Sequence, residues 1–340
     1  MLLGFFLSPD RQLSLPFLNT YLACVLFYYG IVNNSHARAG YWVFVTVLLS
    51  PIFLFLSVGV FAGGAARQLT FNSWACELAS SLPWSLSITP HFNVLGAAFA
   101  VVIPGLVAVT IFRQRAWVRW SAGLLAVIFG GILALSASGG GWIATMTGIL
   151  IVLLFCSSRV MQGALLASGL VWAIFPIWHN ASWIGAIFYP GALSGRIERW
   201  QEIIAVLKDS PLTGLGLGGW WSKASVLGIG GNPHNAYLQL YSDAGALGLI
   251  AFIVAAVIGV RLFWQIMHAD KGSPYYGFAL GSAAGLIAGG IHALIDDNMS
   301  LIVPMGNEYI YFAVPLLWLW AALFVVSAQH LLRNSPKHPP

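Results

Sequence analysis

The stretch "HNAYLQLYSDAGALGLIAFIVAAVIGV", residues 234–260, joins two kinds of sequence. Residues 234–243 include a histidine, an asparagine, a glutamine and an aspartate, whereas every residue after Gly245 is apolar. An apolar run of this length predicts a membrane-spanning helix, because roughly 20 apolar residues cross the hydrocarbon core. The polar beginning is the unusual part, since polar side chains at membrane depth are costly and tend to be there for function.

The composition of the whole chain agrees with a membrane protein. Of 340 residues, 59% are hydrophobic and 7% are charged, and the mean hydropathy is +0.83. Soluble domains carry about 25% charged residues, so only a polytopic membrane protein fits. The net charge of +5 bears on topology and gives no evidence for nucleic acid. The three cysteines have no disulfide or metal-site spacing, and we expect no removable signal peptide.

Apolar segments predict an all-α, polytopic transmembrane helix bundle of about nine to ten spans, since open strands cannot exist in lipid. We expect a single integral membrane domain over residues 1–330 and a disordered cytoplasmic tail over 331–340. The predicted spans are residues 13–32, 41–62, 91–112, 117–136, 142–157, 160–178, 236–262, 277–295 and 308–328.

Basic residues set the expected topology. "RQRAWVR", residues 113–119, is the densest basic loop and is therefore placed in the cytoplasm. The count then leaves the N-terminus outside, which is unusual; either "MLLGFFLSP" dips into the membrane or the count is off by one. Two long segments, about 63–90 and 179–235, fall outside, and long ordered loops are usually functional.

The second external loop is predicted to contain an amphipathic helix over residues 196–208, with Ser194 and Gly195 as caps and an end at Asp209. The glycine run after it, "GLGLGG", follows no strand and precedes no Lys-Ser or Lys-Thr, so it is interpreted as a flexible turn and not a nucleotide loop. The apolar positions of this helix are Ile197, Trp200, Ile204 and Leu207.

Three polar groups are expected at the outer membrane surface. They are Arg196 with Arg199; His234 with Asn232 and Asn235; and "HALIDDNMS", residues 292–300, which contains Asp296 and Asp297. Each has a plain alternative: an arginine that contacts lipid headgroups, a histidine that only begins a helix, and carboxylates that end a helix or bind a cation. The eight histidines have no metal-like spacing.

Taken together, these segments resemble the O-antigen ligase and Wzy-type polymerase superfamily. "GRIERWQEIIAVLKDSPLTGLGLGGW" and "NPHNAYLQLYSDAGALGL" carry the most specific part of the resemblance. "PHFNVLGAAFAVVIP", with Asn93, resembles the start of an earlier span of the family, and "HALIDDNMSLIVP" its C-terminal His/Asp segment. The matching motif positions are Arg196, Trp200, Pro211, Gly214, Gly216, His234, Asn235 and Gly245.

The chain departs from the family at one motif. The family usually has Ser-Arg-Gly at the outer end of a mid-chain span, where the arginine helps to hold the lipid diphosphate. Residues 135–142, "LSASGGGW", contain no arginine. Either another cation substitutes, with Arg67, Arg199 and Lys223 as candidates, or the diphosphate is held more weakly.

The resemblance implies glycan transfer from an undecaprenyl-pyrophosphate carrier to a sugar hydroxyl, on the external face of a bacterial inner membrane, without ATP or cofactor. The sequence requires no metal. Arg196 is expected to stabilise the leaving diphosphate and His234 to act as general base. Expected substrate-binding residues are Arg199, Trp200, Asn235, Asn93, Asp296 and Asp297.

Three alternatives stay open. In a ligase the acceptor is lipid A-core. A polymerase shares the same motifs, but its acceptor is a second carrier-linked glycan. A polyprenyl-glycan transporter would need mid-membrane charges and internal repeats, which are scarce here. A purely structural membrane protein would not need Arg196 and His234 together.

Overall fold

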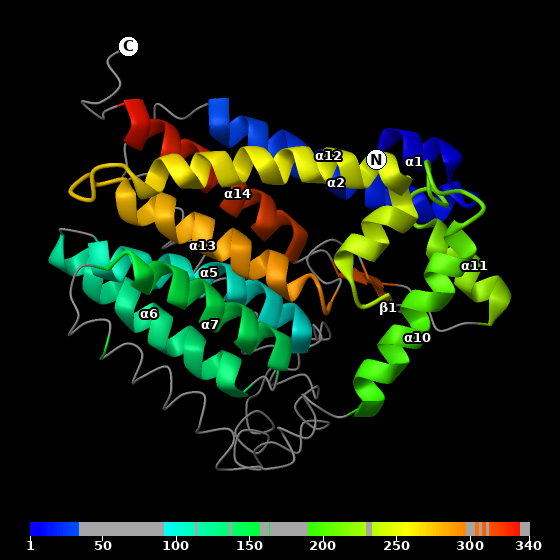
Figure 1. The fold of residues 1–340 in the computed structure, drawn as a ribbon, viewed down its shortest axis with the longest axis horizontal. Coiled ribbons are helices and arrows are strands. Elements are labelled where there is room, and N and C mark those ends of the chain that lie inside the picture. The colour runs from blue at the N-terminus through cyan, green and yellow to red at the C-terminus, as the bar shows by residue number, and fades with distance from the viewer. Residues whose placement is uncertain are drawn as a thin grey trace.

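The computed structural model describes most of the helical part of the chain (Figure 1). The described residues are 1–33, 92–112, 115–135, 138–156, 163, 190–228, 233–296, 303–305, 308–310 and 313–333. Several predicted features lie outside the described residues. They are the span 41–62, the loop 63–90, and residues Asn232 and Asp297. Of the predicted span 160–178, only residue 163 is described.

The described chain is helical apart from one short hairpin, which confirms the predicted all-α membrane fold. Four helices are long and apolar enough to cross a membrane, by length and composition, within the described part of the chain. The helices are α1 (Leu2–Leu7), α2 (Arg11–Asn33), α5 (Phe92–Phe112), α6 (Ala116–Leu135), α7 (Gly139–Leu154), α10 (Pro190–Leu207), α11 (Gly219–Leu227), α12 (Ala236–Met267), α13 (Tyr276–His292) and α14 (Ala313–Arg333). The hairpin pairs β1 (Val303–Met305) with β2 (Glu308–Ile310).

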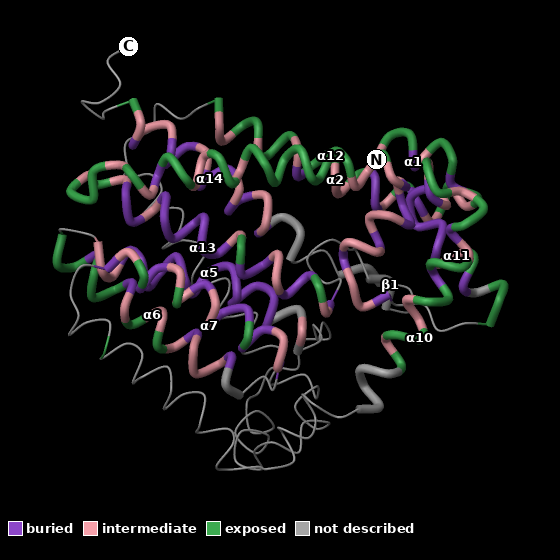
Figure 2. The backbone as a smooth tube through the Cα atoms, in the orientation of Figure 1, coloured by how far each residue is buried: buried purple, intermediate pink, exposed green. Residues whose placement is uncertain are grey.

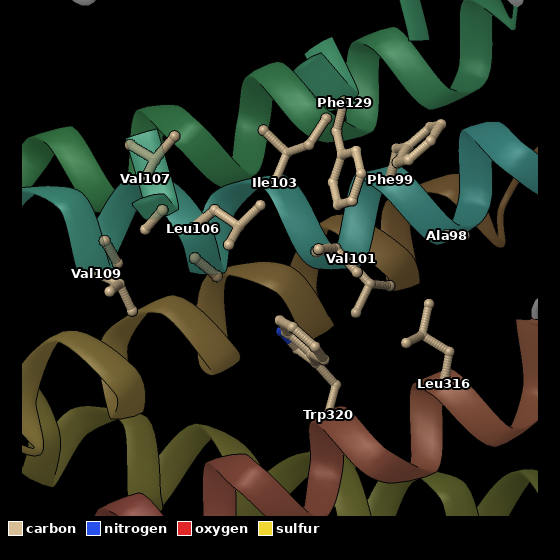
Figure 3. Close-up of a cluster of buried hydrophobic side chains, with 14 of the residues drawn as sticks. Ala98, Phe99, Val101, Ile103, Leu106, Val107, Val109, Phe129, Leu316 and Trp320 are labelled. Atoms are coloured by element: carbon tan, nitrogen blue, oxygen red, sulfur yellow. The ribbon is translucent and has the colours of Figure 1, made fainter. Parts of the chain in front are cut away.

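Helix α5 lies at the centre of the bundle and is buried along most of its length (Figure 2). Its neighbours are α13, α7, α6 and α14. Figure 3 shows Phe99 of α5 facing Phe129 of α6, with Trp320 of α14 reaching toward α5 from the opposite side. Close van der Waals contact between these large side chains stabilises the packing of membrane helices.

Glycines let α13 approach α5 closely. A Cβ added at Gly281 would lie 2.9 Å from the Cα of Gly105, and one added at Gly285 would collide with the carbonyl oxygen of Val101. Small residues at crossings of this kind are typical of membrane helices, which associate through close packing. The close crossing fixes where α13 ends, and its end forms part of the site described below.

Helix α12 consists of two helical parts joined at Gly245, whose φ of 61° and ψ of −160° are not helical. Its 32 residues would extend about 48 Å at 1.5 Å per residue, more than the roughly 30 Å hydrocarbon core. The part after the kink is exposed on nearly all sides (Figure 2), as a lipid-facing span would be. The single span predicted over residues 236–262 therefore corresponds to two helical parts. One is short and polar and ends at Gly245, and the other is apolar and long enough to cross the membrane.

The glycine-rich segment before α11 is a tightly packed buried turn, so its interpretation as a flexible turn was wrong. Gly214, Gly216 and Gly218 all have positive φ, between 70° and 87°, and all are buried. The turn is held by backbone hydrogen bonds from Leu215 N–H to the Ser242 carbonyl (2.7 Å) and from Leu217 N–H to that of Gly4 in α1 (2.8 Å).

Several predicted boundaries need correction. Helix α10 begins at Pro190, so Ser194 and Gly195 lie inside it and are not caps. Its end at Leu207 agrees with the prediction of an end at Asp209. The last helix begins at Ala313, because residues 308–310 form β2, and it continues to Arg333 into the predicted tail.

Substitution of Gly245 by alanine is expected to destabilise the protein. The added Cβ would collide with the Leu212 carbonyl group, and a left-handed residue other than glycine costs about 1–2 kcal/mol by itself. The thermal unfolding midpoint of the purified protein measures the effect. Gly259→Ala is the matched control in the same helix, since its Cβ meets nothing within 4 Å; an equal loss in both variants would contradict the packing of the kink.

Candidate functional site

The buried face of α10 carries Arg196 toward the site. Ile203 and Leu207 are buried against Trp220 and Ala224 of α11. Because residues 196, 200, 203 and 207 follow a helical spacing of three and four, Arg196 and Trp200 share this face. Of the predicted apolar positions, Leu207 is buried and Trp200 half-buried, whereas Ile197 and Ile204 are 41% and 48% exposed.

Trp200 ties α10 to the segment before α12. Its indole Nε1–H donates a hydrogen bond of 2.8 Å to the carbonyl oxygen of Pro233. Pro233 is itself buried. His234 directly follows Pro233 in the chain. The hydrogen bond therefore fixes the position of α10, and with it that of Arg196, relative to His234.

His234 has an unusual backbone conformation. Its φ of 49° makes it the one non-glycine residue with positive φ in the described part of the chain. Such a conformation costs about 1–2 kcal/mol for a residue with a Cβ, and strained residues of this kind concentrate at functional sites. His234 precedes the helix, because α12 begins at Ala236 with Asn235 as its N-cap. His234 is therefore not itself a residue of α12, and its role in the chemistry stays a prediction.

Asn235 and its neighbours dock the start of α12 onto the end of α13. The Asn235 side chain accepts hydrogen bonds from Tyr237 N–H and Leu238 N–H, and its Nδ2 donates to the Leu294 carbonyl at 3.0 Å. Ala236 N–H donates to the Ala293 carbonyl at 2.9 Å. The Tyr237 hydroxyl donates to the Gly290 carbonyl at 2.8 Å. Both polar atoms of Asn235 thus have protein partners, and its contact with a sugar stays a prediction.

Asp296 lies just beyond this docked segment and contacts a residue far away in the sequence. Its carboxylate accepts a hydrogen bond of 2.6 Å from the Nδ2 of Asn93, near the start of α5. Asp296 is 2% exposed. The structure therefore brings together Asn93, Asp296 and the segment of His234, three elements that the sequence predicted separately.

His292 begins the polar segment 292–300 found in the sequence, but it was given no role there. It is fully buried, and neither ring nitrogen has a hydrogen-bond partner among the described residues. Asp296 and Arg196 are the two charged groups that act electrostatically on its ring. The sequence feature that points to His292 is its position at the end of an apolar helix, four residues before Asp296.

The predicted cations lie on α10 and α11 or outside the described residues. Arg199 forms a long ion pair with Glu202, with Nε and Oε2 3.9 Å apart, and its side chain is 28% exposed. No carboxylate of the described residues pairs with the half-buried Arg196. Lys223 is exposed on α11, and Arg67 lies outside the described residues. No group of His, Cys, Asp or Glu in the described ranges is arranged to hold a metal ion.

These features define a class of protein: a polytopic membrane protein with a polar cluster where the starts of α5 and α12 meet the end of α13. Residues 124–253 match the model of the O-antigen ligase family. The resemblance to the O-antigen ligase and Wzy superfamily is thereby confirmed for this part of the chain. The matched region includes Arg196, Trp200 and His234 and ends before Asp296. Comparison with curated proteins gives no match.

Replacement of His292 by leucine is expected to preserve or raise stability. A buried polar group without a partner costs about 1–3 kcal/mol, and an apolar side chain of similar size avoids that cost. The thermal midpoint of purified His292→Leu, relative to the natural protein, measures the effect. A fall of several degrees would show that the imidazole has a stabilising partner, and would remove the unsatisfied histidine from this description of the site.

Proposed function

We propose that this protein is a membrane glycosyltransferase of the O-antigen ligase type. It transfers a glycan from undecaprenyl pyrophosphate to a sugar hydroxyl of the acceptor at the external face of the bacterial inner membrane. The family match supports a ligase or polymerase role in polysaccharide biosynthesis. The observation that carries the proposal is the strained His234, held between the Trp200–Pro233 hydrogen bond on one side and the α12–α13 contacts on the other.

His234 is the proposed general base. The acceptor hydroxyl oxygen forms a bond to the anomeric carbon of the glycan and transfers its proton to the neutral imidazole of His234. A base of this kind contributes typically 10²–10⁴-fold in rate, and imidazole suits the task near neutral pH. Hydrogen bonds on both sides of His234 fix its backbone. Its position therefore varies less than that of a residue in an ordinary loop.

Arg196 is the proposed electrostatic partner of the leaving group. As the bond from the anomeric carbon to the diphosphate oxygen breaks, its electron pair stays with the diphosphate, whose negative charge increases. A guanidinium remains charged at any relevant pH and meets phosphate oxygens in a planar fork. Preorganised charge at a developing anion is usually the largest catalytic contribution. The donor is already activated, so the step consumes no ATP.

The remaining residues are proposed to bind the two substrates. Asn93 and Asp296, which are hydrogen-bonded to each other in this structure, are proposed to bind the hydroxyls of an acceptor sugar, since amides and carboxylates pair with hydroxyl groups. Arg199 and Trp200, which lie on α10 as Arg196 does, are proposed to bind the donor. In a polymerase the same chemistry would act on a second carrier-linked glycan, so the identity of the acceptor separates the two activities.

Substitution of His234 or Arg196 is expected to abolish most transfer without unfolding the protein. His234→Ala should lose at least about 10²-fold in turnover per folded molecule, together with the rise of rate with pH seen for a histidine base. Arg196→Lys should not restore activity, because ammonium lacks the planar fork. The assay measures product by mass spectrometry, with purified lipid-linked glycan and either lipid A-core or carrier-linked glycan as acceptor.

The matched controls for these variants are His268→Ala and Arg261→Lys, which change exposed residues in the distant part of α12 and its C-cap. Both controls should retain turnover close to that of the natural protein. Near-normal turnover of folded His234→Ala would remove this residue from the chemistry, and full activity of Arg196→Lys would remove the bidentate role of the arginine.

The side of the membrane is tested by cysteine labelling in intact cells. Lys223 is exposed on α11, whereas Asp270 is exposed in the connection between α12 and α13. Lys223→Cys should react with a membrane-impermeant maleimide before lysis, and Asp270→Cys only after lysis, because basic loops stay in the cytoplasm. The reversed labelling pattern would place the proposed site on the cytoplasmic side and contradict an external transferase.

A further inference from the structure

A directed chain of hydrogen bonds connects the N-terminus of α7 to Asp296. Gly141 N–H donates to the Ser138 Oγ at 3.2 Å, as an N-cap contact. The Ser138 hydroxyl donates to the Asn93 Oδ1 at 3.1 Å. Asn93 Nδ2 in turn donates to the Asp296 Oδ2 at 2.6 Å. Ser138 is completely buried and Asp296 is 2% exposed, whereas Asn93 between them is half-buried. A hydrogen bond with buried partners is stronger than one on a surface.

The two ends of this chain set its direction. At one end a backbone N–H can only donate, which occupies one lone pair of Ser138. At the other end the Asp296 carboxylate accepts from the Asn93 amide. If the Asn93 amide were turned over, its oxygen would face the carboxylate oxygen of Asp296 and repel it. Every donor therefore points toward Asp296, and each link polarises the next in favour of the carboxylate charge.

Two glycines make this contact sterically possible. A Cβ on Gly141 would lie 2.6 Å from the Cα of Gly96, and a Cβ on Gly96 would collide with the Ser138 hydroxyl. Helices α5 and α7 thus touch backbone to backbone at this level. Because Asn93 lies one turn before Gly96, the close crossing brings its amide within reach of Ser138.

We propose that Ser138 is a positioning residue, which holds the Asp296 carboxylate through Asn93 so that it accepts hydrogen bonds from hydroxyls of the acceptor sugar. This inference rests on the proposed transferase function. Ser138 does not itself touch the acceptor. It orients the amide of Asn93, and that amide fixes one carboxylate oxygen of Asp296 and supports its charge.

The experiment is a double-mutant cycle of Ser138→Ala and Asp296→Asn, read as the KM for the acceptor at saturating donor. Each single variant should raise this KM about tenfold, the value of one hydrogen bond to a charged group. The double variant should be no worse than the poorer single variant, because both changes break the same chain. The donor KM and kcat should change by less than about threefold, a split that a general loss of folding would not produce.

Ser138→Ala also removes the N-cap of α7, which could affect folding. A matched variant controls for this effect. Thr145→Val changes another buried hydroxyl of α7, one with no hydrogen-bond partner among the described residues, and should leave the acceptor KM unchanged. Additive effects, or an unchanged acceptor KM in Ser138→Ala, would overturn the positioning role while the transferase function stands. Absence of transfer by the natural protein with every donor and acceptor would instead overturn the function and, with it, this role of Asp296.

Discussion

The docking of the start of α12 onto the end of α13 is the interaction on which the rest of the site depends. Three hydrogen bonds, donated by the side chain of Asn235, the amide of Ala236 and the hydroxyl of Tyr237, reach carbonyl groups of residues 290–294. Carbonyl groups at the end of a helix lack partners within that helix. Their pairing with α12 satisfies them and places His234 beside the segment that leads to Asp296.

The kink of α12 makes this docking compatible with a membrane-spanning helix. The part before Gly245 belongs to the site, and the part after it faces lipid. At the kink, the amide of Ala246 donates to the Pro211 carbonyl at 2.9 Å, and the Asp243 carboxylate accepts from Gly218 N–H at 3.0 Å. The buried glycine turn therefore connects α10, which carries Arg196, to the helix whose start carries His234. The proposed base and the proposed cation are thus positioned by one continuous piece of structure.

The sequence predicted the membrane fold and the described spans, because apolar length is a local signal. It also named Asn93, Asp296 and the segment of His234, which the structure brings together. It could not predict contacts such as that of Asn93 with Asp296, which are 203 positions apart. The start of α10 was missed because Ser194 and Gly195 were interpreted as caps, although proline at the first helical position was a start signal. The glycine turn was misjudged because its order comes from α1 and α12, which no local pattern reveals.

The most direct test of the account is an experimental structure of the protein with a non-transferable polyprenyl-diphosphate glycan, in which a phosphonate replaces the reactive ester. The account predicts the diphosphate beside Arg196, the anomeric carbon facing His234, and the space toward Asp296 left for the acceptor. It would be contradicted by a donor bound at another part of the bundle, or by a glycan separated from His234 by packed side chains.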